Sequence, residues 1–413
     1  MKSAGEDRLS VLYFGNDWFA ENRTSSHHVA RRLAQRFELF YIECPGIRPP
    51  SGSGRDLMKI FRALRRFLNG PQQVEPGIRV MTLLQVPLHR FAIIRRLNFF
   101  LTWLTVRAVI WRYGLGTRIV WSAMPHVPGL FGRLGEATSV YYCTDDYGLF
   151  PDVDTASMRK LDEETTRRAR TVFVTSETLL QSKTLVNPNT HYSPHGVDVD
   201  HFARAQSKEL RAPEDIAQLP KPIVGYVGLV DRWIDLDMVA ELARKRPEWS
   251  FVFIGRVGFP MEEVPKVPNL HFLGKKPYDR LPEYGAQFDA AIIPYRMSHH
   301  VKHINPLKLR EYLAMGKPVV AVSIPEIDRF VNDICIARSF DEFLAGLDRA
   351  VVTSHDPEAI RQRMAAVSAL SWDARVARVL SIALKDLPTY ASAPLTRAQG
   401  MVAPGGAAVA EPK

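Results

Sequence analysis

Short apolar runs alternate with stretches of helical periodicity along almost the whole chain. In the first half the strand candidates are residues 10–15, 38–44, 78–84, 118–124, 139–145 and 171–176; in the second half they are residues 223–228, 251–255, 270–274, 290–295, 318–322 and 333–337. Helical stretches lie between them, at residues 25–36, 56–68, 93–112, 157–169, 177–186, 234–246, 278–286, 306–315, 326–332 and 340–352. Such alternation is typical of βαβ units and doubly wound parallel sheets. Two sets of about six strands predict an α/β chain with two Rossmann-like domains.

A charged segment that begins at residue 203 separates the two sets of strands. Its sequence, ARAQSKELRAPEDIAQLPKP, contains three prolines and no sustained apolar stripe. A chain of 413 residues is also longer than one hydrophobic core usually supports. We therefore predict a first domain over 1–205, a second over 206–370, a helix over 371–388 that crosses back to the first domain, and a disordered tail over 389–413.

The cysteines and the start of the chain favour a cytoplasmic protein. Cys44, Cys143 and Cys335 each lie in or beside an apolar run, which favours buried thiols over disulfides. The polar start, MKSAGEDRLS, leads directly into the first apolar run, so we expect no signal peptide.

Positive charge is concentrated in one segment of the first half. The net charge is +10, and residues 55–112 hold eleven Lys and Arg against two acidic residues. Residues 55–68 have an amphipathic helical pattern, and residues 88–113 are longer, aromatic and basic. Helices of this kind suit an anionic membrane surface, but the arginines interrupt the apolar run too often for a membrane span. The alternative is a buried helix under a solvated charged face. No nucleic-acid-binding motif accompanies the charge, so we expect no nucleic acid partner.

The segment NPLKLREYLAMGKPVVAV, residues 305–322, predicts a capped helix followed by a buried strand. Asn305 is a good N-cap residue, and Pro306 suits the first helical position. Gly316 fits the usual position after the last turn, and the valine-rich run after it suits a parallel sheet.

The first turn of this predicted helix has residue types that suit nucleotide binding. Free N–H groups around Leu307 and the positive charge of Lys308 suit a phosphate. Glu311 follows three residues later on the same face, where its carboxylate can accept hydrogen bonds from a vicinal diol such as a ribose. The alternative is an ordinary capped helix of an α/β protein, with Lys308 and Glu311 as solvated charges.

Five segments carry a resemblance to one family of enzymes: YFGNDWFAENRTSSHHVARRLA (13–34), PHGVDVDHF (194–202), YVGLVDRWIDLDMV (226–239), FVFIGR (251–256) and NPLKLREYLAMGKPVV (305–320). Together they resemble the GT-B glycosyltransferases of group 1, or family 4, especially the teichuronic-acid and exopolysaccharide type. The resemblance covers roughly residues 10 to 386 and implies the GT-B fold. It also implies retaining transfer of a sugar from a nucleotide sugar, with no cofactor and no metal ion.

Two departures from the family pattern concern the donor site. Glu311 matches the second acid of the acidic-x7-acidic motif, but His303 stands at the first, sugar-contacting position. Leu229 stands where the family's phosphate-binding arginine is expected, so Arg232 and Arg256 become the candidates for that role.

Further candidates lie in the first half of the chain. Gly15 ends the first strand, where a glycine permits close approach of a ligand or simply a turn, and Asp17 follows on that loop with Asn16 and Trp18. The resemblance suggests His126, after the strand at 118–124, as a sugar-contacting histidine; a structural histidine is the alternative. One of His27 and His28 is a weaker candidate of the same kind.

Two other clusters invite functional readings. The motif HHVKH contains His299, His300 and His303, but it lacks a Cys or carboxylate ligand and contains Lys302, so we expect a substrate-facing loop and no metal site. Asp145 and Asp146 end a strand, where an acid acts as a base or caps a helix; capping is the favoured alternative.

The sequence thus predicts a glycosyltransferase at the inner face of the cell membrane, held peripherally by an anionic surface. Its acceptor would be a lipid-linked sugar or a growing polysaccharide. Two alternatives stay open: a GT-B-fold epimerase that acts on the nucleotide sugar itself, and a catalytically degenerate GT-B scaffold at the membrane.

Overall fold

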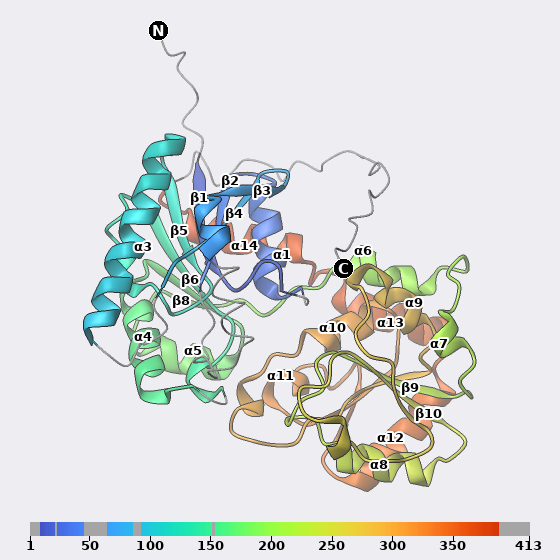
Figure 1. Cartoon of the computed structure of the whole chain (residues 1–413). Helices are drawn as coiled ribbons and strands as arrows, with labels where there is room; N and C mark the ends of the chain where they lie inside the picture. The colour runs from blue at the N-terminus through green and yellow to red at the C-terminus, as the bar shows by residue number, and fades with distance from the viewer. Residues whose placement is uncertain (1–8, 21–22, 45–63, 86–91, 151–152, 388–413) are drawn as a thin grey trace, which may run out of the picture.

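The computed structural model describes residues 9–20, 23–44, 64–85, 92–150 and 153–387. They form two α/β domains that lie side by side, each built on one sheet (Figure 1). The predicted α/β fold with two Rossmann-like domains is confirmed. The predicted tail over 389–413 and most of the predicted helix over 56–68 lie outside the described residues.

The first sheet has eight strands in the order β3-β4-β2-β1-β5-β6-β7-β8. Their bounds are β1 Ser10–Gly15, β2 Glu38–Glu43, β3 Gln72–Glu75, β4 Ile78–Thr82, β5 Arg118–Ser122, β6 Thr138–Cys143, β7 Thr171–Val174 and β8 Thr190–Tyr192. The prediction of about six parallel strands is therefore wrong for this domain. It missed β8, which has only three residues, and β3, which is polar and runs antiparallel to β4 at the sheet edge.

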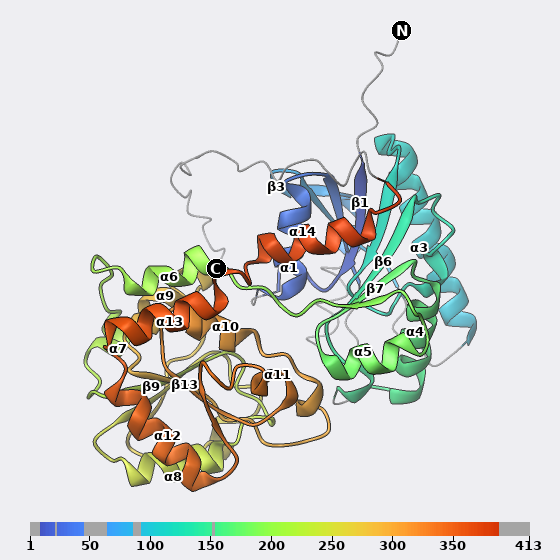
Figure 2. The ribbon, with the colours of Figure 1, turned by 180° about the vertical axis from the view of Figure 1, so that it is seen from behind.

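Alternate side chains of the central strands serve two separate hydrophobic clusters, as the pleat of a strand requires. Val11 and Tyr13 face helices α1 (Ser25–Ala34) and α14 (Trp372–Ala383). Leu12 and Phe14 face α3 (Ala92–Tyr113), α4 (Thr155–Arg168) and α5 (Glu177–Thr184). Helix α14 therefore packs on the first sheet although it comes last in the chain, as Figure 2 shows from behind.

The second sheet has six parallel strands in the order β11-β10-β9-β12-β13-β14. Their bounds are β9 Ile223–Val227, β10 Ser250–Ile254, β11 Leu270–Phe272, β12 Ala290–Ile293, β13 Val319–Val322 and β14 Cys335–Ala337. Helices α8 (Leu236–Lys245) and α12 (Phe340–Val352) lie on one side, and α9 (Leu281–Ala286), α10 (Leu307–Ala314) and α13 (Pro357–Ser368) on the other (Figure 1). Sequence periodicity did not predict α13.

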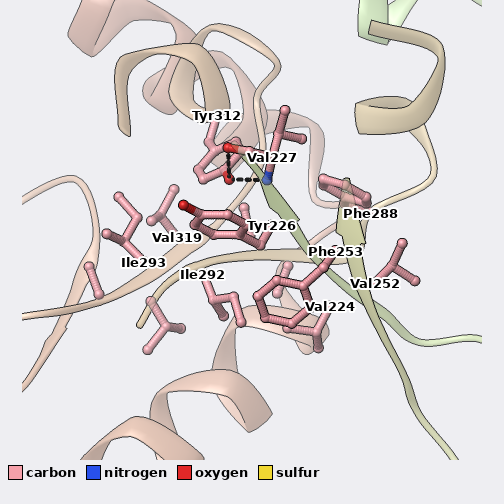
Figure 3. Packing of buried hydrophobic residues seen from close by; sticks show 14 of the residues in the cluster. Val224, Tyr226, Val227, Val252, Phe253, Phe288, Ile292, Ile293, Tyr312 and Val319 are labelled. Carbon is pink, nitrogen blue, oxygen red and sulfur yellow. Dashed lines mark hydrogen bonds between the residues drawn. The ribbon is translucent and has the colours of Figure 1, made fainter. Parts of the chain in front are cut away.

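A hydrogen bond in the core of this domain fixes α10 against the sheet. The hydroxyl of Tyr312, on α10, accepts a hydrogen bond of 2.7 Å from the backbone N–H of Val227, the last residue of β9 (Figure 3). Both residues lie in the apolar cluster with Tyr226 and Phe253. Because the contact is buried, it holds the first turns of α10 at the carboxyl end of β9.

The carboxyl ends of strands from both sheets meet at the domain interface. The Nδ2 of Asn305 donates to the carbonyl of Thr175, directly after β7, at 2.6 Å. Glu326, after β13, accepts from the N–H of Glu177 at 2.8 Å and from the hydroxyl of Tyr192 at 2.7 Å. Ligands of parallel α/β sheets bind outside these strand ends, so the interface is the natural place for a site. Within the described part of the chain, no helix combines the length and apolar character that a membrane crossing requires.

Candidate functional site

Helix α10 begins one residue later than expected, and the prediction that Asn305 caps it is wrong. Pro306 is the N-cap residue, and no side chain of the described residues caps the helix. The carboxamide of Asn305 is buried and used elsewhere: it donates to Thr175 and Glu326, and its Oδ1 accepts from Arg310 Nη1 at 2.6 Å. No described side chain therefore competes with an anion for the first N–H groups of the helix. Gly316 follows the helix with φ of +71°, as predicted.

Lys308 brings its charge to the carboxyl end of β9. Its Nζ donates to the hydroxyl of Tyr295 at 3.0 Å and lies 5.2 Å from the ring centre of Tyr226. Its chain passes directly over Gly228, where a Cβ atom would stand 2.9 Å from Lys308 Cε. Gly228 has φ of +147°, a conformation that favours glycine. The ammonium group of Lys308 therefore lies above Gly228, at the carboxyl end of β9, where it can bind an anionic group.

Glu311 lies one turn further along α10 and is largely buried. Burial raises its pKa to about 7, although Lys308 acts in the opposite direction and Asp198 in the same one. Tyr278 is an electrostatic neighbour of Glu311, and its buried hydroxyl makes no hydrogen bond within the described residues. A buried hydroxyl next to a carboxyl group can bind a polyol, because each group would gain a partner it lacks. Sequence reasoning missed Tyr278, which stands in an unremarkable polar stretch.

The two arginine candidates lie on the loops after β9 and β10. Arg232 pairs with Glu263 at 2.6 Å and covers the ring of Phe259 at 4.7 Å. Arg256 is exposed, and Gly255 precedes it at the end of β10 with φ of +151°. The side chain of Arg232 is therefore paired with Glu263. A diphosphate-binding role of either arginine stays a prediction.

The histidine loop directly precedes α10. The Nδ1 of His303 is bonded to the carbonyl of His299 at 2.8 Å. His300 reaches the first domain, where its ring lies 5.1 Å from that of Phe150. Within the described residues no group of three or more His, Cys, Asp or Glu is arranged to hold a metal ion. The loop is thus part of the domain interface, and His303 stands half-buried beside the start of α10.

In the first domain, Gly15 has a packing reason of its own. A Cβ atom at this position would lie 2.2 Å from the hydroxyl of Tyr41, which donates to Asn16 Oδ1 at 3.1 Å. Asp17 is exposed; its Oδ1 accepts from the N–H of Phe19 at 3.0 Å and lies 3.5 Å from Arg66 Nη1. The ligand-binding roles predicted for Gly15 and Asp17 stay predictions.

Glu43, at the carboxyl end of β2, is a candidate that sequence reasoning missed. Its carboxylate accepts from the N–H of Trp18 at 2.9 Å and from the hydroxyl of Thr82, and lies 3.6 Å from Arg66. Burial raises its pKa to about 7. Glu43 thus anchors the loop that carries Asp17 and adds a second acid beside it. The available signal was an acid at the end of an otherwise apolar strand.

The paired acids after β6 have different environments. Asp146 accepts from the N–H of Gly148 at 3.2 Å and caps a short 3-10 helix, which confirms helix capping for this residue. Burial raises the pKa of Asp145 to about 7. His126 follows β5, the neighbour of β1, and is half-buried.

The adjacent histidines of α1 also differ. The Nδ1 of His27 lies 3.1 Å from the N–H of Thr24 and completes a capping box, which is a structural role. His28 stacks on Trp372 at 5.2 Å and lies 5.6 Å from the ring of Tyr278. It therefore touches α14 and the second domain together.

Comparison with known proteins shows which proteins this chain is similar to. Residues 221–369, which contain the second sheet and α10, match the family model of the group 1 glycosyl transferases. The chain is 24% identical over 349 residues to a protein named as a teichuronic acid biosynthesis glycosyltransferase, TuaH, of Bacillus subtilis strain 168, which covers 78% of this chain and 82% of that protein.

Solved structures share the two-domain fold. Sucrose-phosphate synthase from Thermosynechococcus elongatus superposes with a TM-score of 0.65 at 15% identity, over 92% of this chain and all of that one (100%). Anabaena HepE, solved in complex with UDP, gives a TM-score of 0.59 at 13% identity, over 94% and 100% of the two chains. These likenesses establish the GT-B architecture, and the second domain matches the group 1 glycosyl transferase family model.

Proposed function

We propose that the protein moves a sugar from a nucleoside diphosphate sugar to a lipid-linked or polysaccharide acceptor, with retention of the anomeric configuration. The observation that carries the proposal is the start of α10, where Lys308 lies over Gly228 and Glu311 follows on the same helix. Structural neighbours are consistent with such a donor: HepE was solved with UDP, and an Escherichia coli neighbour with UDP-2-fluoro glucose.

The diphosphate would bind at the helix terminus. The uncapped N–H groups of the first turn and the ammonium of Lys308 are fixed donors, aimed where negative charge grows as the glycosidic bond breaks. Such preorganised donors stabilise the transition state, in which negative charge grows on the leaving group, more than they stabilise the ground state. The carboxylate of Glu311 and the hydroxyl of Tyr278 would hold the ribose hydroxyls.

The sugar would lie between the domains, with His303 on one side and His126 on the other. In same-face attack the leaving diphosphate oxygen takes the proton of the acceptor hydroxyl, so no protein nucleophile, metal ion or cofactor is required. Asp17, exposed on the loop after β1, would bind acceptor hydroxyls, and the buried carboxylate of Glu43 would hold that loop through the N–H of Trp18. We place the reaction at the inner face of the cell membrane, on the grounds of the basic, aromatic segment over 55–112.

A nucleotide titration tests the donor site. Thermal unfolding is followed with UDP, GDP and dTDP, because a ligand that binds only the folded state raises the melting temperature. We expect at least one nucleotide to raise it, and Glu311→Ala and Lys308→Ala to abolish the shift. Glu241→Ala, at an exposed acid on α8, is the matched control and should respond like the wild type.

Two outcomes would overturn the proposal. If no nucleotide shifts the melting temperature and Glu311→Ala behaves as the wild type does, α10 is not a donor site. If the protein isomerises the sugar of its nucleotide donor when no acceptor is present, it is an epimerase.

A further inference from the structure

The outward face of α3 carries a row of large apolar side chains, the stripe. Five large side chains recur along the helix at intervals of four, three, four and seven residues, so they lie on one side of it. They and their exposed fractions are Ile93 (75%), Leu97 (45%), Phe100 (53%), Leu104 (50%) and Trp111 (84%). Single exposed apolar residues are ordinary, but an aligned row of this kind marks an interaction surface.

The stripe does not face the core of the domain. Helix α3 contacts the sheet through a different row of residues, which is buried: Asn98, Thr102, Val106 and Val109. Two members of that buried row are polar, whereas the solvent-facing row is apolar. Figure 1 shows α3 at the outer side of the first domain, on the side remote from the second domain. The apolar row therefore has no partner within the described residues.

The charged residues of α3 itself are all of one sign. Arg96, Arg107 and Arg112 are exposed on α3, and α3 contains no acidic residue. Beside the stripe, Phe99, Phe100, Trp103 and Arg133 line an open, mainly apolar hollow of about 420 Å³. Exposed aromatic and aliphatic side chains flanked by arginines match the boundary between acyl chains and phosphate headgroups.

We propose that the outer face of α3 lies in the surface of an anionic membrane, with the helix parallel to the membrane plane. The stripe side chains enter the upper acyl region, and the flanking arginines bind lipid phosphates. A second copy of the chain is the less suitable occupant. Two α3 faces packed on each other would bring arginines together with no acidic residue of α3 to compensate them.

This surface is joined to the region of the candidate site. The ring of Phe99, on α3, packs so closely on Gly129 that a Cβ atom there would lie 2.9 Å from it. Gly129 belongs to the 3-10 helix Pro128–Leu130, which follows His126 on the loop after β5. Helix α3, whose outer face would contact the membrane, is therefore packed against the segment that follows His126. The inference deepens the proposed function, because it names the surface that brings a lipid-linked acceptor near the site.

Vesicle binding of the full chain tests the inference without any sugar donor. Sedimentation is measured with vesicles of phosphatidylcholine alone and of phosphatidylcholine with phosphatidylglycerol. We expect binding to the anionic vesicles only, weakened by added salt. The double variant Ile93→Gln/Trp111→Gln removes the two most exposed stripe residues, so folding should be preserved, and we expect at least tenfold weaker partitioning. Arg96→Glu/Arg112→Glu should weaken binding to a similar extent.

Matched controls come from apolar residues that are equally exposed elsewhere. Leu185→Gln/Val352→Gln changes two side chains that are 88% and 84% exposed, and we expect it to bind vesicles as the wild type does. The emission of Trp111 should shift to the blue on vesicle binding, and this part of the signal should be lost in Trp111→Phe.

Three results would overturn the inference: equal binding to both kinds of vesicle, unchanged binding of the stripe variant, or a dimer in solution that the stripe variant converts to a monomer. Failure of the proposed function has a different signature. If the stripe holds the membrane but α10 binds no donor, vesicle binding persists while every nucleotide shift is absent. If only the membrane inference fails, the nucleotide shifts persist and the stripe variant retains them.

Discussion

The side chain of Lys308 occupies the space above Gly228 that any larger residue would need. A Cβ atom at Gly228 would stand 2.9 Å from Lys308 Cε and 3.2 Å from Lys308 Nζ. The glycine directly after β9 and the lysine on α10 thus form one unit, although they are 80 positions apart in the sequence. The position of the Lys308 ammonium group therefore depends on the absence of a side chain at Gly228.

Gly228→Ala should therefore displace the ammonium group. We expect at least tenfold weaker binding of the nucleoside diphosphate, with a lower melting temperature because φ at this position is +147°. A double-mutant cycle with Lys308→Ala separates the two effects, since a steric effect on Lys308 cannot operate once the lysine is gone. Additive losses of affinity in the cycle would contradict the steric coupling.

Glu311 should make the protein less stable as the pH rises. Burial raises its pKa from 4.5 to about 7, so between these values the folded state holds a proton that the unfolded chain releases. The free energy of unfolding then falls with rising pH across this window, by about 2 kcal/mol for a largely buried carboxyl.

Glu311→Gln removes that titration and separates stability from binding. We expect it to stabilise the protein at pH 8, with little effect at pH 4.5, and to weaken nucleotide binding at the higher pH. Denaturant unfolding at both pH values measures the first effect. Glu241→Gln, at an exposed position, should change neither quantity. An equal stability change at both pH values would show that the carboxyl of Glu311 does not titrate in this window.

The sequence predicted the repeating units of the fold well, because apolar periodicity reports burial directly. Its failures are short or polar elements. The strand β8 has three residues, and β3 has the sequence QQVE, so neither has a pattern to detect. Helix α13 was missed although Asp356 caps it and Pro357 begins it, since these residues mark a helix start only when a periodic run follows.

The candidate site was less predictable, because its contacts join segments far apart in the chain. Local rules made Asn305 an N-cap, but its carboxamide binds Thr175, 130 residues earlier. In the sequence Glu43 is only a polar residue at the end of a strand. The structure shows that it accepts a hydrogen bond from the N–H of Trp18, 25 positions earlier. The basic, aromatic character of α3 was visible, yet only docking on the sheet decides which row of side chains faces outward.

Gly15 tests whether the loop after β1 is shaped by packing. Gly15→Ala would place a methyl group 2.2 Å from the Tyr41 hydroxyl, so we expect a clear loss of stability, about 2 kcal/mol, from overpacking. The loss should be smaller in a Tyr41→Phe background, which removes the nearest atom. Thermal unfolding of the four proteins of this cycle gives the coupling. An equal loss in both backgrounds would mean that the steric conflict does not involve the hydroxyl.

Asn305 tests the interface between the domains. Its carboxamide is 4% exposed and binds Thr175, Glu326 and Arg310, so Asn305→Ala leaves several buried polar groups without this partner. We expect a loss of about 2–3 kcal/mol in the free energy of unfolding, since a buried polar group left unpaired costs about 1–3 kcal/mol. Asn69→Ala is the matched control, at an exposed asparagine whose backbone carbonyl, and not its side chain, accepts from Gln72. Because the lost bond to Thr175 joins the loop before α10 to the first domain, Asn305→Ala should also raise the rate of proteolysis between the domains. Lys308→Ala should weaken nucleotide binding without that effect. Stability and proteolysis like those of the Asn69 variant would show that Asn305 does not hold the two domains together.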